Sequence, residues 1–216
     1  MARAAARFSR ALSQPAYVAP RYTGIASFMR APVVTEEADL TRHFADGGVA
    51  MFGVPFDGGV TNRPGARHGP REVRNASSLM RAVHPTSRIN VFETCAIADA
   101  GDVPFSEAFV TKSCHDDTHA FASRLLRAGA VPLAVGGDHS ISLPLLRAVC
   151  ETQDAPVGLI HFDAHTDTWD SQWGARREPI PPRSAPPRYP SAAFICTVQG
   201  RIITTARRSV GPSRRG

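Results

Sequence analysis

Two short stretches of the sequence contain side chains that can bind a metal ion. The first reads VPLAVGGDHS and places His139 just after a pair of glycines. The second reads GLIHFDAHTD and places Asp163, His165 and Asp167 at alternate positions. In an extended chain, alternate residues lie on one face, roughly 6.5–7 Å apart along the backbone. The spacing therefore predicts three potential ligands that converge on one side of a strand end.

The chemistry of these side chains favours a divalent cation. A lone histidine such as His139 is usually a structural residue, and His161, within the second stretch, is interpreted as a residue of the strand. Three polar or charged groups that close a buried strand cost several kcal/mol unless they are paired or bound to a cation. Mixed imidazole and carboxylate ligands suit Mn²⁺ or a similar ion. Several carboxylates in one site suggest two ions that share a bridging carboxylate, about 3.5–4 Å apart.

The combination of G-G-D-H-S with D-A-H-T-D resembles the manganese ureohydrolases, the agmatinase and arginase family. The resemblance implies two Mn²⁺ ions as cofactors. It also implies that His139 is a ligand of one ion, that Asp163 bridges both ions, and that His165 and Asp167 each bind one.

Upstream segments are similar to the agmatinase and guanidinobutyrase branch of the family. They are the stretches PRYTGIASFMR and GVPFD, together with RPGARHGP, which contains Arg63 and Arg67. These two arginines either line the mouth of a substrate site or fix their loop by hydrogen bonds.

The implied reaction is the hydrolysis of a small guanidino compound to an amine and urea. A guanidinium carbon is a poor electrophile because resonance spreads its charge, so hydroxide is needed at neutral pH. Two metal ions can supply hydroxide by lowering the pKa of a water toward about 7. Agmatine would give putrescine, and guanidinobutyrate would give aminobutyrate.

The resemblance ends near Arg176, before the implied site is complete. The family has a later S-x-D-x-D-x-x-D-P stretch, a histidine soon after D-A-H-T-D, and a glutamate near its C-terminus. Here no histidine follows His165 and no aspartate follows Asp170. A frameshift or an aberrant junction is expected near this point, and little or no ureohydrolase activity is expected of the chain. An inactive metal-binding fragment is therefore the alternative reading.

The elements around the two motifs predict an α/β fold. Apolar runs at 48–55, 131–135 and 157–162 predict strands, and helical patterns cover residues 70–83, 105–128 and 140–150. Strands that alternate with helices indicate a parallel sheet. The resemblance implies a three-layer α/β/α ureohydrolase fold, of which only the N-terminal half is present. The predicted organisation is an N-terminal arm (1–34), a partial ureohydrolase domain (35–170) and a tail rich in proline and arginine (171–216).

A third hypothesis is a basic nucleic-acid-binding protein, and the charge distribution argues against it. The net charge is +6, but residues 1–170 contain 18 acidic and 16 basic side chains, so the excess lies in the tail. No apolar run approaches the roughly 18–20 residues of a membrane span. Four widely spaced cysteines favour a reducing, cytoplasmic compartment, with the mitochondrion as the alternative because the first 30 residues contain five arginines and no acid. The expected partners are a small guanidino substrate and, by the resemblance, further copies of the chain, with no specific nucleic acid and no membrane.

Overall fold

The computed structural model describes residues 20–154, 157–165 and 167, and the backbone of 171–172, 175–176 and 191–192. The chain divides into two compact units, Met1–Asp154 and Ala155–Gly216. Most of the expected arm and tail lies outside the described residues. The predicted domain boundaries at residues 34 and 170 therefore stay predictions.

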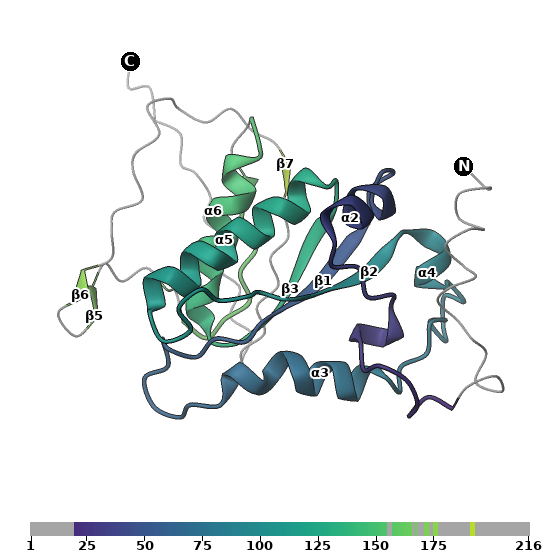
Figure 1. Cartoon of the computed structure of the whole chain (residues 1–216), viewed down its shortest axis with the longest axis horizontal. Helices are drawn as coiled ribbons and strands as arrows, with labels where there is room; N and C mark the ends of the chain where they lie inside the picture. The colour runs from purple at the N-terminus through teal and green to yellow at the C-terminus, as the bar shows by residue number, and fades with distance from the viewer. Residues whose placement is uncertain are drawn as a thin grey trace, which may run out of the picture. The chain divides into compact units, whose positions relative to one another are not determined.

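The first unit is built on a three-stranded parallel sheet with the strand order β2-β1-β3 (Figure 1). Its strands are β1 (Val49–Val54), β2 (Ile97–Asp102) and β3 (Val131–Gly136). From Ala50 onward, every residue of β1 is buried. A continuous buried run is typical of the central strand of a parallel sheet, because such a strand is covered on both faces.

Helices cover both faces of this sheet, which confirms the predicted three-layer α/β/α architecture for the part of the fold that is present. In Figure 1, α3 lies below the sheet, and α5 and α6 lie above it, packed against each other. The helices are α2 (Glu37–His43), α3 (Gly69–Ser77), α4 (Val91–Thr94), α5 (Thr111–Arg127) and α6 (Ser142–Glu151), with the 3₁₀ turns η1 (Phe28–Arg30), η2 (Ala66–His68) and η3 (His139–Ile141).

Part of the core lies between the sheet and α5. The rings of Phe52 on β1 and Phe121 on α5 are 5.2 Å apart, and Phe52 is fully buried. Leu40 and Leu125 are also fully buried. Each such side chain contributes about 1.5–3 kcal/mol through removal of apolar surface from water. This packing holds the carboxyl ends of β1 and β3 in fixed positions.

On the other side of the sheet, Arg74 of α3 joins the helix to β2. Its guanidinium donates two hydrogen bonds to Asp99, at 2.7 and 2.9 Å, and one to Asp102 at 2.6 Å. It also lies over the ring of Phe28, 4.1 Å from the centroid. The backbone N–H groups of Phe28 and Gly101 donate to the same Asp99 carboxylate. Asp99 is therefore a buried charge with several partners, and it fastens the segment before α2 to the sheet.

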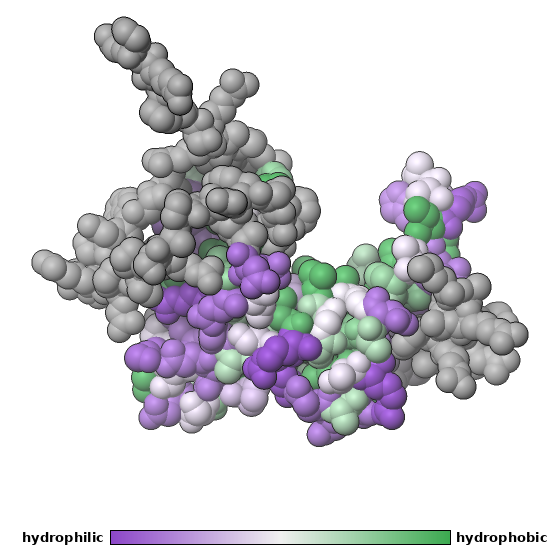
Figure 2. All heavy atoms as spheres, turned by 90° about the horizontal axis from the view of Figure 1, so that it is seen from above, coloured by the Kyte–Doolittle hydropathy of each residue, from purple (hydrophilic) through white to green (hydrophobic). Residues whose placement is uncertain are grey.

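β3 pairs only with β1 in the described part of the chain, so it is an edge strand of the sheet. Val131 and Leu133 on this strand are 61% and 45% exposed. Figure 2 shows that hydrophobic residues (green) also reach the surface on the face seen there. An exposed apolar edge is a surface on which another strand can pair.

The second unit contains short strands. β4 (Val157–Gly158) pairs in parallel with β7 (Ser191–Ala192), and β5 (Ser171–Gln172) pairs antiparallel with β6 (Ala175–Arg176). The strand expected at 157–162 is thus present only at its first two residues. The apolar side chains that follow, Leu159, Ile160 and Phe162, are 40–50% exposed, so they lack the cover that a core strand has.

Candidate metal centre

The chain turns sharply at the carboxyl end of β3, and the turn requires glycine. Gly137 has a φ of +44°, and a Cβ at this position would overlap the carbonyl oxygens of Val54 and Phe56. The absence of a side chain therefore lets the turn after β3 lie directly against the chain that leaves β1. The N–H of Asp138 donates to the Phe56 carbonyl across this contact, at 2.8 Å.

Asp138 fixes the turn that contains His139. One carboxylate oxygen accepts hydrogen bonds from the Ser140 N–H at 2.8 Å and the Ser140 hydroxyl at 2.6 Å. The other oxygen accepts the Gly59 N–H at 2.6 Å. Asp138 is thus the N-cap of η3, and this leaves His139 as the first residue of the turn.

The loop after β1 is organised around a second buried carboxylate, Asp57. It accepts hydrogen bonds from the backbone N–H groups of Gly65 and Arg67 and pairs with the Arg67 guanidinium, whose Nε lies 2.7 Å away. Hydrogen bonding by Arg67 is the main reason that the pKa of Asp57 falls to about 2; burial acts in the opposite direction, and the backbone donors add to the lowering.

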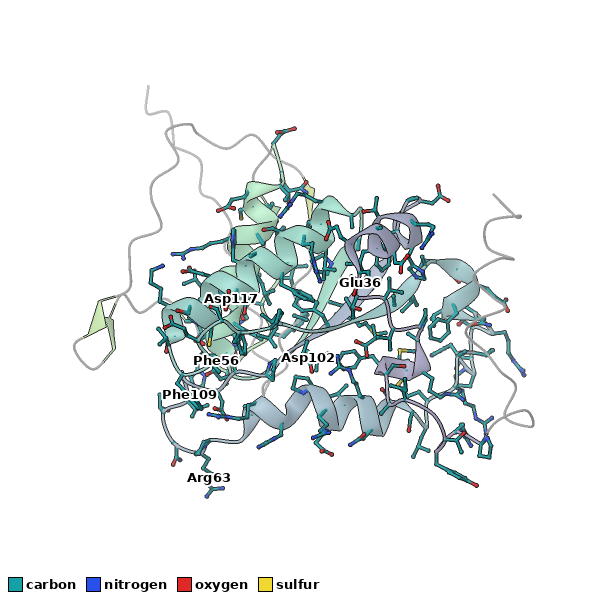
Figure 3. The ribbon with its side chains drawn as sticks, viewed as in Figure 1. Glu36, Phe56, Arg63, Asp102, Phe109 and Asp117 are labelled. Atoms are coloured by element: carbon teal, nitrogen blue, oxygen red, sulfur yellow. The ribbon has the colours of Figure 1, made fainter. Side chains whose placement is uncertain are left out.

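The two arginines of this loop differ in what they contact. The hydrogen bonds of Arg67 show that it fixes the loop, which is one of the two roles considered for it. Arg63 is exposed, and Figure 3 shows its side chain directed outward from the loop. The structure therefore gives Arg63 no part in holding the loop together.

In the second unit, three possible metal ligands lie together. The ligand atoms of His161, Asp163 and Asp167 fall within 4.8 Å of one another. His161 Nε2 is 3.6 Å from a carboxylate oxygen of Asp163 and 3.4 Å from one of Asp167. The side chain of Asp163 is only 2% exposed. A buried carboxylate beside an imidazole and a second carboxylate is a donor set that fits a divalent cation such as Mn²⁺.

His165 is more exposed than this trio, although it contacts Asp163. Its side chain is 75% exposed, and its Nδ1 is 3.2 Å from Asp163. The alternation of Asp163, His165 and Asp167 predicts one face only while the chain stays extended. Here the Asp163 carboxylate accepts the backbone N–H of His165 at 2.9 Å, two residues along, which bends the chain in an Asx turn. Asp167 then has a φ of +51°. The role of His165 as a ligand stays a prediction.

His161 is the residue that sequence reasoning left out, because it was interpreted as part of the strand. A signal for it was available: His161 and Asp163 are two residues apart, as are Asp163 and His165. The same alternation therefore pointed in both directions from Asp163. The structure brings Asp163 and Asp167 together with His161, and it places His139 in η3 of the first unit.

Comparisons of the chain with a family model, with curated relatives and with solved structures agree with one another. The model of the family described as the arginase family matches residues 47–207. This match runs beyond residue 176, where the motif resemblance ends. The guanidinopropionase of Pseudomonas aeruginosa is 46% identical over 155 residues, which are 72% of this chain and 46% of that protein. The mitochondrial guanidino acid hydrolase of Homo sapiens is 40% identical over 162 residues, 75% of this chain and 43% of that protein.

Among solved structures, the proclavaminate amidinohydrolase of Streptomyces clavuligerus superposes with a TM-score of 0.63 at 35% identity. The superposition covers 73% of this chain and 50% of that one. The chain thus spans about half the length of the relatives that it matches.

Proposed function

Because the chain belongs to the arginase family, we propose that it has the function of a ureohydrolase that converts a small guanidino compound to an amine and urea. The observation that carries the proposal is the buried Asp163 carboxylate with His161 and Asp167 beside it, at the D-A-H-T-D motif. The relatives named guanidinopropionase, agmatinase and guanidinobutyrase support a guanidino substrate. Agmatine and guanidinobutyrate are the substrates that we propose first.

As the resemblance implies, His139, Asp163, His165 and Asp167 would hold a cofactor of two Mn²⁺ ions. When bound, the ions lower the pKa of a water so that hydroxide is available at neutral pH. Hydrogen bonds within the chain orient two of these residues. Asp138 fixes the turn of His139, and the Asp163 carboxylate holds the backbone of His165. Asp57 and Arg67 keep the loop after β1 in place.

The activity of the 216 residues as printed is expected to be low. They lack the later S-x-D-x-D-x-x-D-P stretch of the family, so they would offer the two ions fewer ligands and leave the hydroxide less well positioned. The histidine that the family places after D-A-H-T-D is also lacking, and a proton-transferring group typically contributes about 10²–10⁴-fold. The second candidate function, an inactive metal-binding fragment, is favoured by this incomplete set.

One experiment separates the two candidates. The purified chain is freed of metal by chelation and reloaded with Mn²⁺. Bound metal is then counted by atomic emission, and urea release is measured with agmatine, guanidinobutyrate and guanidinopropionate. Urea release that Asp163→Ala abolishes supports the enzyme, whereas metal binding without urea release supports the fragment. A chain that binds no Mn²⁺ refutes both.

No described helix is long and apolar enough to cross a membrane. We propose the cytoplasm as the compartment, with the mitochondrion as the alternative, since some relatives are named as mitochondrial. Assembly with further copies of the chain is proposed from the family resemblance alone.

A further inference from the structure

We propose that His115 is a positioning residue, which holds the turn carrying His139 through a hydrogen-bond relay that passes by way of Ser140 to Asp138. The relay connects three parts of the first unit: helix α5, the turn after β3 and the loop after β1. Its significance for metal binding rests on the proposed function, but its existence can be tested without a metal.

The relay is made of short contacts between side chains and backbone. His115 Nε2 lies 3.0 Å from the Ser140 hydroxyl, and this hydroxyl lies 2.6 Å from Asp138 Oδ1. Asp138 Oδ2 then accepts the Gly59 N–H at 2.6 Å. A Cβ on Gly59 would lie 3.0 Å from both Asp138 and Ser140, so the loop passes very close to the relay.

The donor and the acceptor in each hydrogen bond of the relay follow from the protons that each side chain can carry. An ionised carboxylate only accepts hydrogen bonds, so Ser140 donates its single hydroxyl proton to Asp138. The Ser140 oxygen is then the acceptor toward His115, and Nε2 of His115 must carry a proton. Burial lowers the pKa of His115, with Asp138 opposing this and Arg147 adding to it, which favours the neutral ring at pH 7. His115 is therefore the neutral tautomer with its proton on Nε2.

The ring of His115 also packs against the loop after β1. Its centroid is 5.8 Å from that of Phe56 in an edge-on arrangement, and the Phe56 carbonyl accepts the N–H of Asp138. His115 thus contacts the loop after β1 through its ring and the turn after β3 through Nε2. Loss of either contact frees the backbone on both sides of His139.

The test uses three variants of the full chain, freed of metal, and hydrogen exchange of the backbone amides. In His115→Phe, which keeps a ring but loses the donor, exchange in residues 57–59 and 138–141 should rise about 3- to 10-fold, the effect of one net hydrogen bond. In His115→Gln, whose amide can donate from nearly the same place, exchange should return toward the wild-type rate. The control is His119→Ala: it lies one turn further along α5, pairs with Glu151, and should leave both segments unchanged.

Two further measurements complete the test. The ¹⁵N spectrum of the wild-type ring should show a protonated Nε2, and an Nδ1–H tautomer would overturn the relay whether or not the variants fold. Calorimetric titration with Mn²⁺ should show affinity about 10-fold weaker in His115→Phe and recovered in His115→Gln, as for other partners outside the ligand shell. If the wild-type chain binds no Mn²⁺, the proposed function fails. Hydrogen exchange of the metal-free variants still tests whether the relay exists. Unchanged exchange in folded His115→Phe refutes it.

Discussion

Replacement of Arg74 by methionine tests whether a buried ion pair holds the N-terminal part of the first unit together. Methionine keeps much of the length of the side chain but removes its charge and its donors. Asp99, whose side chain is 2% exposed, would then lose both of its hydrogen bonds to the guanidinium. The contact between the guanidinium and the Phe28 ring would be lost as well.

The expected cost is large because the remaining charge cannot reach water. Removal of one partner of a buried ion pair typically costs about 3–5 kcal/mol, against a total stability of roughly 5–15 kcal/mol for a domain. The two backbone N–H groups that still reach Asp99 favour the lower end of that range. Urea unfolding followed by circular dichroism measures the change as a shift of the midpoint at constant slope.

Two control variants separate charge burial from packing. Asp102→Asn alters the partner that is 46% exposed and should cost at most about 1 kcal/mol. In the double variant Arg74→Met with Asp99→Asn, no charge is left buried, so it should cost less than Arg74→Met alone. A cost below about 1 kcal/mol for Arg74→Met, or a double variant that costs as much as Arg74→Met or more, would refute this reasoning.

Three further predictions concern the loops of the candidate site. Asp57→Asn should make the free energy of unfolding less sensitive to acid. The pKa of Asp57 is lowered from 3.8 to about 2, so its carboxylate contributes stability that is complete above about pH 4 and is lost as the pH falls toward 2. Unfolding curves between pH 5 and pH 2 test this, and parallel losses in both proteins would contradict it. Gly137→Ala should cost about 2 kcal/mol or more because of its positive φ and the overlap with two carbonyl oxygens, and an unchanged urea midpoint would count against the described turn. Asp163→Asn should weaken Mn²⁺ binding by more than the roughly 10–100-fold that follows loss of a group bonded to a metal ligand. An affinity equal to that of the wild-type chain would exclude Asp163 as a ligand.

Sequence reasoning located most elements of the sheet because their apolar runs are unbroken. The run at 48–55 became β1 (Val49–Val54), and the run at 131–135 became β3, one residue longer. The strand β2 was missed because its sequence, IADAGD, has small residues and two acids in place of a hydrophobic run. Its central Asp99 can be buried because Arg74 pairs with it from α3, and a partner so far along the chain gives no local signal.

Helix boundaries were less predictable than helix positions. The pattern from Phe105 predicted a helix over 105–128, yet α5 begins only at Thr111. The preceding residues follow another path, because Asp117 accepts hydrogen bonds from the backbone and side chain of Ser106. Likewise α3 ends at Ser77 rather than near residue 83. At the start of α5, contacts formed by side chains determine a boundary that periodicity could not predict.

The candidate site was predictable where the ligand types are rare in a core and unpredictable where the backbone bends. Asp163 and Asp167 were identified from D-A-H-T-D, since buried carboxylates need a cation or a partner. The bend at His165 depends on one hydrogen bond from its N–H to Asp163, and the sequence did not indicate that His161 would lie near both Asp163 and Asp167. The Asp138 relay to His115 joins residues 23 positions apart, so only the folded chain brings them together.

The place of β1 at the centre of its sheet has a consequence for synthesis of the chain. Val49 pairs with Ile97 on one side and with Val131 on the other, and the second partner lies 82 residues later. Translation at about 5–20 residues per second separates the two by roughly 4 to 16 s. During that interval the most apolar strand of the sheet has left the ribosome without its second neighbour. The nascent chain should therefore be most dependent on chaperones after β1 has emerged and before β3 has.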